Sequence, residues 1–143
     1  IQAQILELMK DLVARVGTAL LIITHNLGVV ARYADRVNVM YAGKIREVGS
    51  AKDIYSEPRH PYTVGLLESV PRLDDPPGAK LQPIEGEIPD MSHLPSGCAF
   101  EPRCRWAVEK CRQDDPSLTE IATNRYSACW QHEQVQRLEK IER

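Results

Sequence analysis

The hydrophobic positions at the start of the chain follow two successive patterns. Over residues 1–16 they recur every three or four positions, at Ile1, Ile5, Leu8 and Leu12. This spacing predicts an amphipathic helix that ends at Gly17. Residues 18–24 form a continuous apolar run rich in β-branched side chains. Such a run predicts a strand covered on both faces, as in a parallel α/β sheet.

Shorter elements are predicted over the middle of the chain. Residues 27–34 have the pattern of a short helix, and Asn26 before them is a suitable N-cap. Residues 36–41 and 44–48 predict a β-hairpin. Its turn contains Gly43, a residue that adopts positive φ without steric cost.

Two further helix starts carry their own signals. Ser50 is suited to cap a short helix that follows the hairpin. Pro61 is suited to the first position of a helix over residues 62–69, where its missing N–H costs no hydrogen bond. His60 stands between Pro58 and Pro61, and we interpret it as a packed structural residue.

The pattern then breaks down into a proline-rich segment and a tail. Six prolines lie between residues 71 and 95, where few apolar positions are periodic, so we expect an extended linker there. In the tail, residues 106–112 predict a short helix and residues 131–143 predict a charged helix. The chain therefore divides into residues 1–70, a linker over residues 71–97, and a small cysteine-rich subdomain over residues 98–143.

Composition excludes some classes of protein. The formal net charge is −2, which argues against binding to a nucleic-acid backbone, because such proteins carry a basic excess. The longest apolar run is too short to cross a membrane. The opening residues contain no Met and lie at once in a helical pattern, so we expect the chain to come from inside a larger protein.

All four cysteines lie in the last third of the chain, with the spacing C-x5-C-x6-C-x17-C: Cys98, Cys104, Cys111 and Cys129. Clustered thiols in a reducing compartment more often form a metal or redox site than a disulfide framework. Four thiolates suit tetrahedral zinc or a [4Fe–4S] cluster, and four metal-free thiols are the third alternative. Residues 98–130 contain few large apolar side chains, so a bound metal would supply stability that the core lacks.

His25 directly follows the predicted buried strand. Ligands bind at the carboxyl edge of open parallel sheets, so a histidine there can reach a phosphate; the alternative is a polar residue that only satisfies loop backbone groups. Residues 21–31 (LIITHNLGVVA) and 34–45 (ADRVNVMYAGKI) resemble the switch-histidine region of ABC transporter ATPases. By this resemblance His25 matches the switch histidine that contacts the γ-phosphate of ATP. The family usually has Asp where this chain has Asn26, so catalytic polarisation is expected to rest mainly on His25.

The resemblance extends beyond the nucleotide-binding core. Residues 57–63 (EPRHPYT), 97–104 (GCAFEPRC) and 128–130 (ACW) resemble the extension found in the oligopeptide, dipeptide and nickel importer branch. The implied fold is α/β: part of an ABC ATPase nucleotide-binding domain, with the end of its parallel sheet plus a hairpin, followed by the cysteine-rich subdomain. The resemblance also implies ATP with Mg²⁺ as ligand of the parent protein. In some members of this branch the corresponding cysteines hold an iron–sulfur cluster, so all four are candidate ligands.

The function implied by this resemblance is ATP-driven import of oligopeptides or dipeptides, at the cytoplasmic face of the cell membrane. The expected partners are a second ATP-binding subunit and transmembrane permease subunits, with a homodimer of the chain as a further expectation and no nucleic acid. The printed sequence has no G-x-x-x-x-G-K-[ST] loop, no Asp-Glu strand end and no Leu-Ser-Gly-Gly motif, so we expect no ATP hydrolysis by this chain alone. The alternatives are a free-standing metal-binding interaction module and a fragment of an importer for nickel or another small solute.

Overall fold

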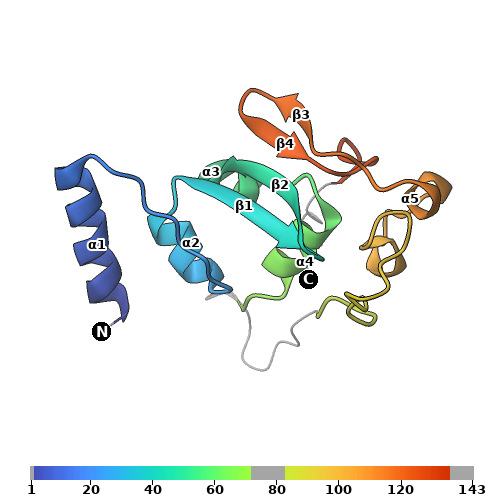
Figure 1. Ribbon diagram of the computed structural model, residues 1–143, viewed down its shortest axis with the longest axis horizontal. Coiled ribbons are helices and arrows are strands. Elements are labelled where there is room, and N and C mark those ends of the chain that lie inside the picture. Colours follow the sequence, from blue (N-terminus) through green and yellow to red (C-terminus); the bar gives the residue numbers. More distant parts are fainter. Residues whose placement is uncertain (1, 72–82, 136–143) are drawn as a thin grey trace, which may run out of the picture.

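A computed structural model describes residues 2–71 and 83–135. At its centre is a four-stranded antiparallel sheet in the order β1-β2-β4-β3 (Figure 1). The strands are β1 (Arg36–Tyr41), β2 (Lys44–Ser50), β3 (Thr119–Ala122) and β4 (Arg125–Ser127). The fold is therefore mixed α/β, as predicted, but every pairing in the described residues is antiparallel.

The predicted hairpin is confirmed as β1 and β2. Its two turn residues, Ala42 and Gly43, both have positive φ, at 49° and 74°. Two such residues match the right-handed twist of the flanking strands. The sequence indicated Gly43 for this role, whereas Ala42 adopts a conformation that its own type does not favour.

Six helical segments accompany the sheet: α1 (Gln2–Val16), α2 (Leu27–Tyr33), α3 (Ala51–Ser56), α4 (Pro61–Glu68), the 3₁₀ turn η1 (Glu101–Arg103) and α5 (Glu109–Gln113). The predicted caps are confirmed, since the side chains of Asn26 and Ser50 accept hydrogen bonds from the first turns of α2 and α3. Pro61 occupies the start of α4. The short tail helix begins at Glu109, later than predicted. No helix among the described residues is long and apolar enough to cross a membrane.

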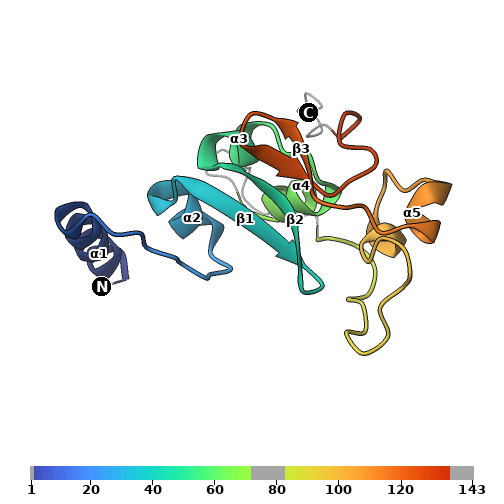
Figure 2. The same ribbon diagram turned by 45° about the horizontal axis from the view of Figure 1, so that its top comes forward.

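The predicted parallel strand over residues 18–24 is wrong. This segment is irregular and leaves Leu21 80% and Ile23 93% exposed. A strand needs a hydrogen-bonded neighbour on at least one side, and the described part of the chain pairs none with these residues. Both views accordingly show α1 and this segment standing apart from the sheet (Figures 1 and 2).

The cysteine-rich segment is not confirmed as a separate subdomain. Its strand β4 pairs with β2, with Glu47 opposite Ser127 and Val48 opposite Tyr126, so one sheet joins both predicted parts. Residues 83–97 of the expected linker are irregular, and Ile84 packs closely against Gly65 of α4. Of the predicted helix over residues 131–143, residues 131–134 form turns, and positions beyond Val135 lie outside the described residues.

The compact core lies where the hairpin tip meets the cysteine-rich segment. Five buried side chains form it: Tyr41, Cys98, Ala99, Phe100 and Cys111. The Tyr41 ring lies 5.1 Å from the Phe100 ring, edge to face, and 4.6 Å from the ring of Tyr62 on α4. Aromatic pairs at these separations add to the stabilisation from burial alone. Two of the four cysteines are thus part of the core itself.

Candidate functional site

His25 lies in a bend between the irregular segment and α2, and its side chain is exposed. The residues on either side of it are held. The Asn26 amide N–H donates a hydrogen bond to Thr24 Oγ1 at 3.0 Å, and Asn26 Oδ1 accepts one from the N–H of Val29 at 3.2 Å. The imidazole is therefore presented to solvent from a short, locally braced turn.

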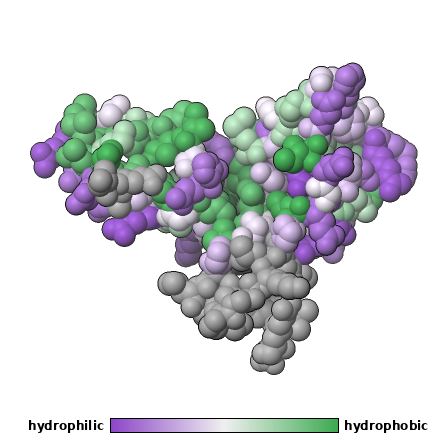
Figure 3. Space-filling view, turned by 90° about the horizontal axis from the view of Figure 1, so that it is seen from below, coloured by the Kyte–Doolittle hydropathy of each residue, from purple (hydrophilic) through white to green (hydrophobic). Residues whose placement is uncertain are grey.

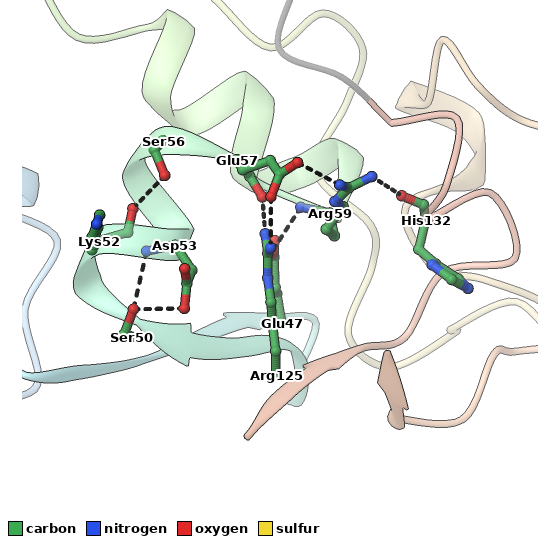
Figure 4. Close-up of polar contacts among 9 residues, drawn as sticks. All are labelled: Glu47, Ser50, Lys52, Asp53, Ser56, Glu57, Arg59, Arg125 and His132. Atoms are coloured by element: carbon green, nitrogen blue, oxygen red, sulfur yellow. Dashed lines mark hydrogen bonds and ion pairs between the residues drawn. The ribbon is translucent and has the colours of Figure 1, made fainter. Parts of the chain in front are cut away.

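The segment after β2 is joined to the tail by a network of charged groups that the sequence did not reveal (Figure 4). Arg125 on β4 forms an ion pair with Glu57 at 3.0 Å and also donates to the Glu57 backbone carbonyl. Glu57 in turn pairs with Arg59 at 2.6 Å. The buried Glu47 on β2 accepts a hydrogen bond from the Arg59 backbone N–H at 2.6 Å. Burial raises the pKa of Glu47, and the hydrogen bond from the Arg59 backbone N–H lowers it in part.

His60 is almost fully buried beside this network. Its Nδ1 accepts a hydrogen bond from the Tyr62 backbone N–H at 3.1 Å, which caps α4. Burial lowers the pKa of His60 to about 3, and the positive charge of Arg46 acts in the same direction. The imidazole is therefore neutral at physiological pH, with the backbone of Ala128 as a further partner. Its position supports a structural role.

A second ion-pair cluster fixes the tail to the hairpin. The guanidinium of Arg46, 2% exposed, and the ammonium of Lys44 each lie 2.7 Å from the Asp115 carboxylate. Burial alone would raise the pKa of Asp115, but the hydrogen bonds from Arg46 and Lys44 lower it overall. Breaking a buried pair of this kind leaves an uncompensated charge, which is strongly destabilising.

The structure gathers the four cysteines in one region. Cys98 and Cys111 are buried, Cys104 and Cys129 are half-buried, and all four are free thiols. The Cys98 N–H donates to the Cys111 carbonyl at 2.7 Å. Gly97 permits this approach, because a Cβ there would lie 2.3 Å from the same oxygen. Burial is the main cause that raises the pKa of Cys129, and the other three thiols act in the same direction.

The sulfur atoms have backbone donors around them. The N–H of Gln131 donates to Cys129 Sγ at 3.4 Å, and backbone N–H groups also act on Cys98 and Cys104. Burial raises the pKa of Cys104 to about 11 and that of Cys129 to about 12. These thiols are therefore protonated at neutral pH. As they stand, no group of three or more His, Cys, Asp or Glu side chains within residues 2–71 and 83–135 is arranged to hold a metal ion.

Four basic residues lie between the first and last cysteines of the candidate site along the chain, at Arg103, Arg105, Lys110 and Arg112, and each makes a contact of its own. Arg103 donates to the carbonyls of Ile84 and Glu85, both at 2.9 Å, and Arg105 pairs with Glu68 at 2.8 Å. Lys110 lies over the Trp130 ring at 3.6 Å, and Arg112 pairs with Glu101 at 2.8 Å. Their fixed contacts shape the loops that carry the cysteines.

Comparison with known proteins gives consistent matches. Residues 46–111 match the family described as oligopeptide/dipeptide transporter, C-terminal region. The chain is 51% identical over 138 residues to a putative peptide import ATP-binding protein of Brucella ovis, covering 92% of this chain and 41% of that protein. It is 49% identical to the dipeptide transport ATP-binding protein DppD of Bacillus subtilis, covering 94% of this chain and 40% of that protein.

A third relative is the oligopeptide transport ATP-binding protein OppD of Mycobacterium tuberculosis, 47% identical over 94% of this chain and 22% of that protein. The chain thus spans less than half the length of the relatives it matches. Within that span the identity is 47–51%. Residues 46–111 therefore match the oligopeptide/dipeptide transporter C-terminal region, and the chain as a whole is similar to part of proteins named as peptide, oligopeptide or dipeptide ATP-binding proteins.

Proposed function

We propose that this chain forms part of an ATP-binding subunit that energises the import of oligopeptides or dipeptides. The observation that carries this proposal is the 47–51% identity, over more than nine-tenths of the chain, to proteins named for peptide, oligopeptide or dipeptide transport. Those names favour a peptide cargo over nickel. The subunit would bind ATP with Mg²⁺, pair with a second ATP-binding subunit and dock on transmembrane permease subunits at the cytoplasmic face of the membrane.

Within that subunit, His25 is the residue proposed to contact the γ-phosphate. An exposed imidazole can donate a hydrogen bond to a phosphate oxygen or orient an attacking water. The bracing of Thr24 and Asn26 around it supports this role, because a group that acts on a transferring phosphoryl must be held in place. Asn26 contributes the cap and the neutral amide, so proton transfer would rest on His25.

The test replaces His25 by Ala in the intact ATP-binding subunit, assembled with its permease in lipid vesicles. We expect kcat for ATP hydrolysis to fall about 100-fold, with a smaller change in KM for ATP. His93→Ala is the matched control, because His93 is an exposed histidine that pairs with Asp90 in another loop. A kcat within twofold of the unaltered subunit for His25→Ala would contradict the proposed role.

We further propose that Cys98, Cys104, Cys111 and Cys129 hold a [4Fe–4S] cluster. Two observations support this: the four thiols share one region, and backbone N–H groups are directed at three of the sulfurs. Thiolates are the ligands that such clusters and zinc both take. The protonated thiols are not arranged around a common metal position. Binding of a cluster therefore requires that the thiols lose their protons and that the side chains rotate toward a common point.

The measurement is an absorption spectrum with iron, sulfide and zinc analysis on protein purified without oxygen. Absorption near ~400 nm with about four irons and four sulfides per chain would support the cluster. Cys104→Ser should then lose both the iron and the absorption. One zinc per chain and no colour would replace the cluster by a structural zinc site, and metal-free protein would remove the proposal.

A further inference from the structure

Helix α3 is tied to the start of α2, the helix that begins two residues after His25, and to the chain just after α2. The Tyr55 hydroxyl on α3 donates a hydrogen bond to the carbonyl of Leu27, the first residue of α2. Beyond the C-cap of α2, the backbone N–H of Ala51 donates to the carbonyl of Asp35 at 3.0 Å. A displacement of the first turn of α2 away from α3 would break the bond from Tyr55.

The Tyr55 hydroxyl reaches the first turn of α2 specifically. It is half-buried there, and burial raises the pKa of Tyr55 while the backbone of Ala31 lowers it in part. The hydroxyl therefore stays protonated and remains a donor at neutral pH. Leu27 and Ala31 are one helical turn apart, so the phenol group lies at the first turn of α2.

The same turn holds the residue next to His25. Asn26 Oδ1 accepts from the Val29 N–H, and the Asn26 N–H donates to Thr24 Oγ1. A shift of the first turn of α2 must move Asn26, and Asn26 is covalently joined to His25. The position of the histidine thus depends on a hydroxyl that lies 30 residues further along the chain.

We propose that Tyr55 is a positioning residue for His25: its hydroxyl anchors the first turn of α2 and thereby sets the direction in which the imidazole points. This inference rests on the proposed role of His25. It gives helix α3, which follows the hairpin, a role at the proposed nucleotide site. In this role α3 holds the turn that contains His25 in position.

The experiment compares Tyr55→Phe with Tyr33→Phe in the full chain by NMR. Tyr33 is the matched control, because it lies at the opposite end of α2 and its hydroxyl donates to Glu7 at 2.9 Å. For Tyr55→Phe we expect the Val29 and Val30 amides to exchange with solvent about fivefold faster, the factor expected for one neutral hydrogen bond. The imidazole resonances of His25 should shift as well, whereas Tyr33→Phe should leave both signals unchanged.

In the intact importer, Tyr55→Phe should lower kcat for ATP hydrolysis with KM for ATP unchanged. The rate is expressed per folded subunit, so that a loss of stability alone would leave it unchanged. Unchanged His25 resonances and unchanged Val29 and Val30 exchange in Tyr55→Phe would overturn the proposal. So would backbone order parameters below ~0.6 for residues 25–30 beside a rigid α3 in the unaltered chain, a measurement that needs no variant. The NMR signals do not depend on ATP, so failure of the His25→Ala test is distinguishable from failure of the Tyr55 tie.

Discussion

At the scale of single residues, the burial of His60 links the stability of the protein to pH. In the unfolded chain this imidazole takes up a proton below pH 6.5, whereas in the folded protein it does so only near pH 3. The unfolded state therefore binds more protons between these values, and stability falls as the pH falls through that window. Above pH 6.5 the group is neutral in both states and imposes no penalty.

We predict that His60→Gln flattens this dependence. An amide can keep the acceptor for the Tyr62 N–H but does not titrate. Below pH 6 the unaltered chain should lose about 1.4 kcal/mol of unfolding free energy per pH unit more than the variant does. Urea titrations between pH 7.5 and pH 5 measure this difference. Glu47 acts with the opposite sign because burial raises its pKa, but its contribution cancels between the two proteins; parallel slopes would exclude His60 as the source.

At the scale of elements, Arg125 holds strand β4 to Glu57, the C-cap residue of α3. Its guanidinium is the first cause of the lowered pKa of Glu57, and it also binds the Glu57 backbone carbonyl. Because Glu57 itself is largely exposed, solvent screens the ion pair, which therefore contributes little to stability. The hydrogen bond from Arg125 to the Glu57 backbone carbonyl adds to the stabilisation from the ion pair. None of the other side chains drawn in Figure 4 replaces Arg125 as a donor to that carbonyl.

We predict that Arg125→Met, which keeps the aliphatic length, lowers the free energy of unfolding by about 1–2 kcal/mol. The pKa of Glu57 should rise toward 4.5, its ordinary value, because the hydrogen bond from Arg125, which is the largest cause of its lowering, is gone. Denaturant titration and NMR of the Glu57 side chain measure the two effects. Glu57→Gln keeps the backbone carbonyl and should cost less. Equal losses for both variants would mean that the carbonyl bond contributes nothing.

Sequence reasoning succeeded for elements whose signals are local. Asn26, Ser50 and Pro61 each mark a helix start within one turn, and the hairpin is specified by its own turn. The strand over residues 18–24 failed, because a strand depends on a neighbour that apolar character alone does not supply. Strands β3 and β4 were missed since both are short. Asn124, at φ 58° between them, is the turn signal that would have indicated them.

The candidate sites divide in the same way. The location of His25 before a capped helix and the grouping of the cysteines follow from sequence-adjacent features. The ion pairs of Glu57 with Arg125 and of Arg46 with Asp115 could not be predicted from the sequence. The two residues of each pair are far apart in the chain, and nothing in the sequence distinguishes them from ordinary charged residues of the surface. Only the folded sheet brings them together.

At the scale of the whole molecule, apolar side chains gather on the side that carries α1 (Figure 3). The exposed apolar side chains of α1 and of the irregular segment after it include Ile5, Leu8, Leu12, Val16, Leu21 and Ile23. Contiguous apolar surface of this kind drives association. We predict that the chain by itself self-associates through it, and that Leu8→Lys with Leu12→Lys shifts the sedimentation coefficient toward a monomer at the same concentration. Met40→Lys, an exposed apolar change on β1, is the control and should leave association intact.

The pairing of β2 with β4 also bears on how the protein is made. During synthesis the hairpin of β1 and β2 leaves the ribosome long before residues 125–127 exist, and a two-stranded hairpin is marginal in water. The edge of β2 therefore stays unpaired until β4 has been made. Closing the long loop between these two strands is then slow. Chains that terminate before Arg125 would keep that edge exposed, which makes premature truncation a direct route to aggregation.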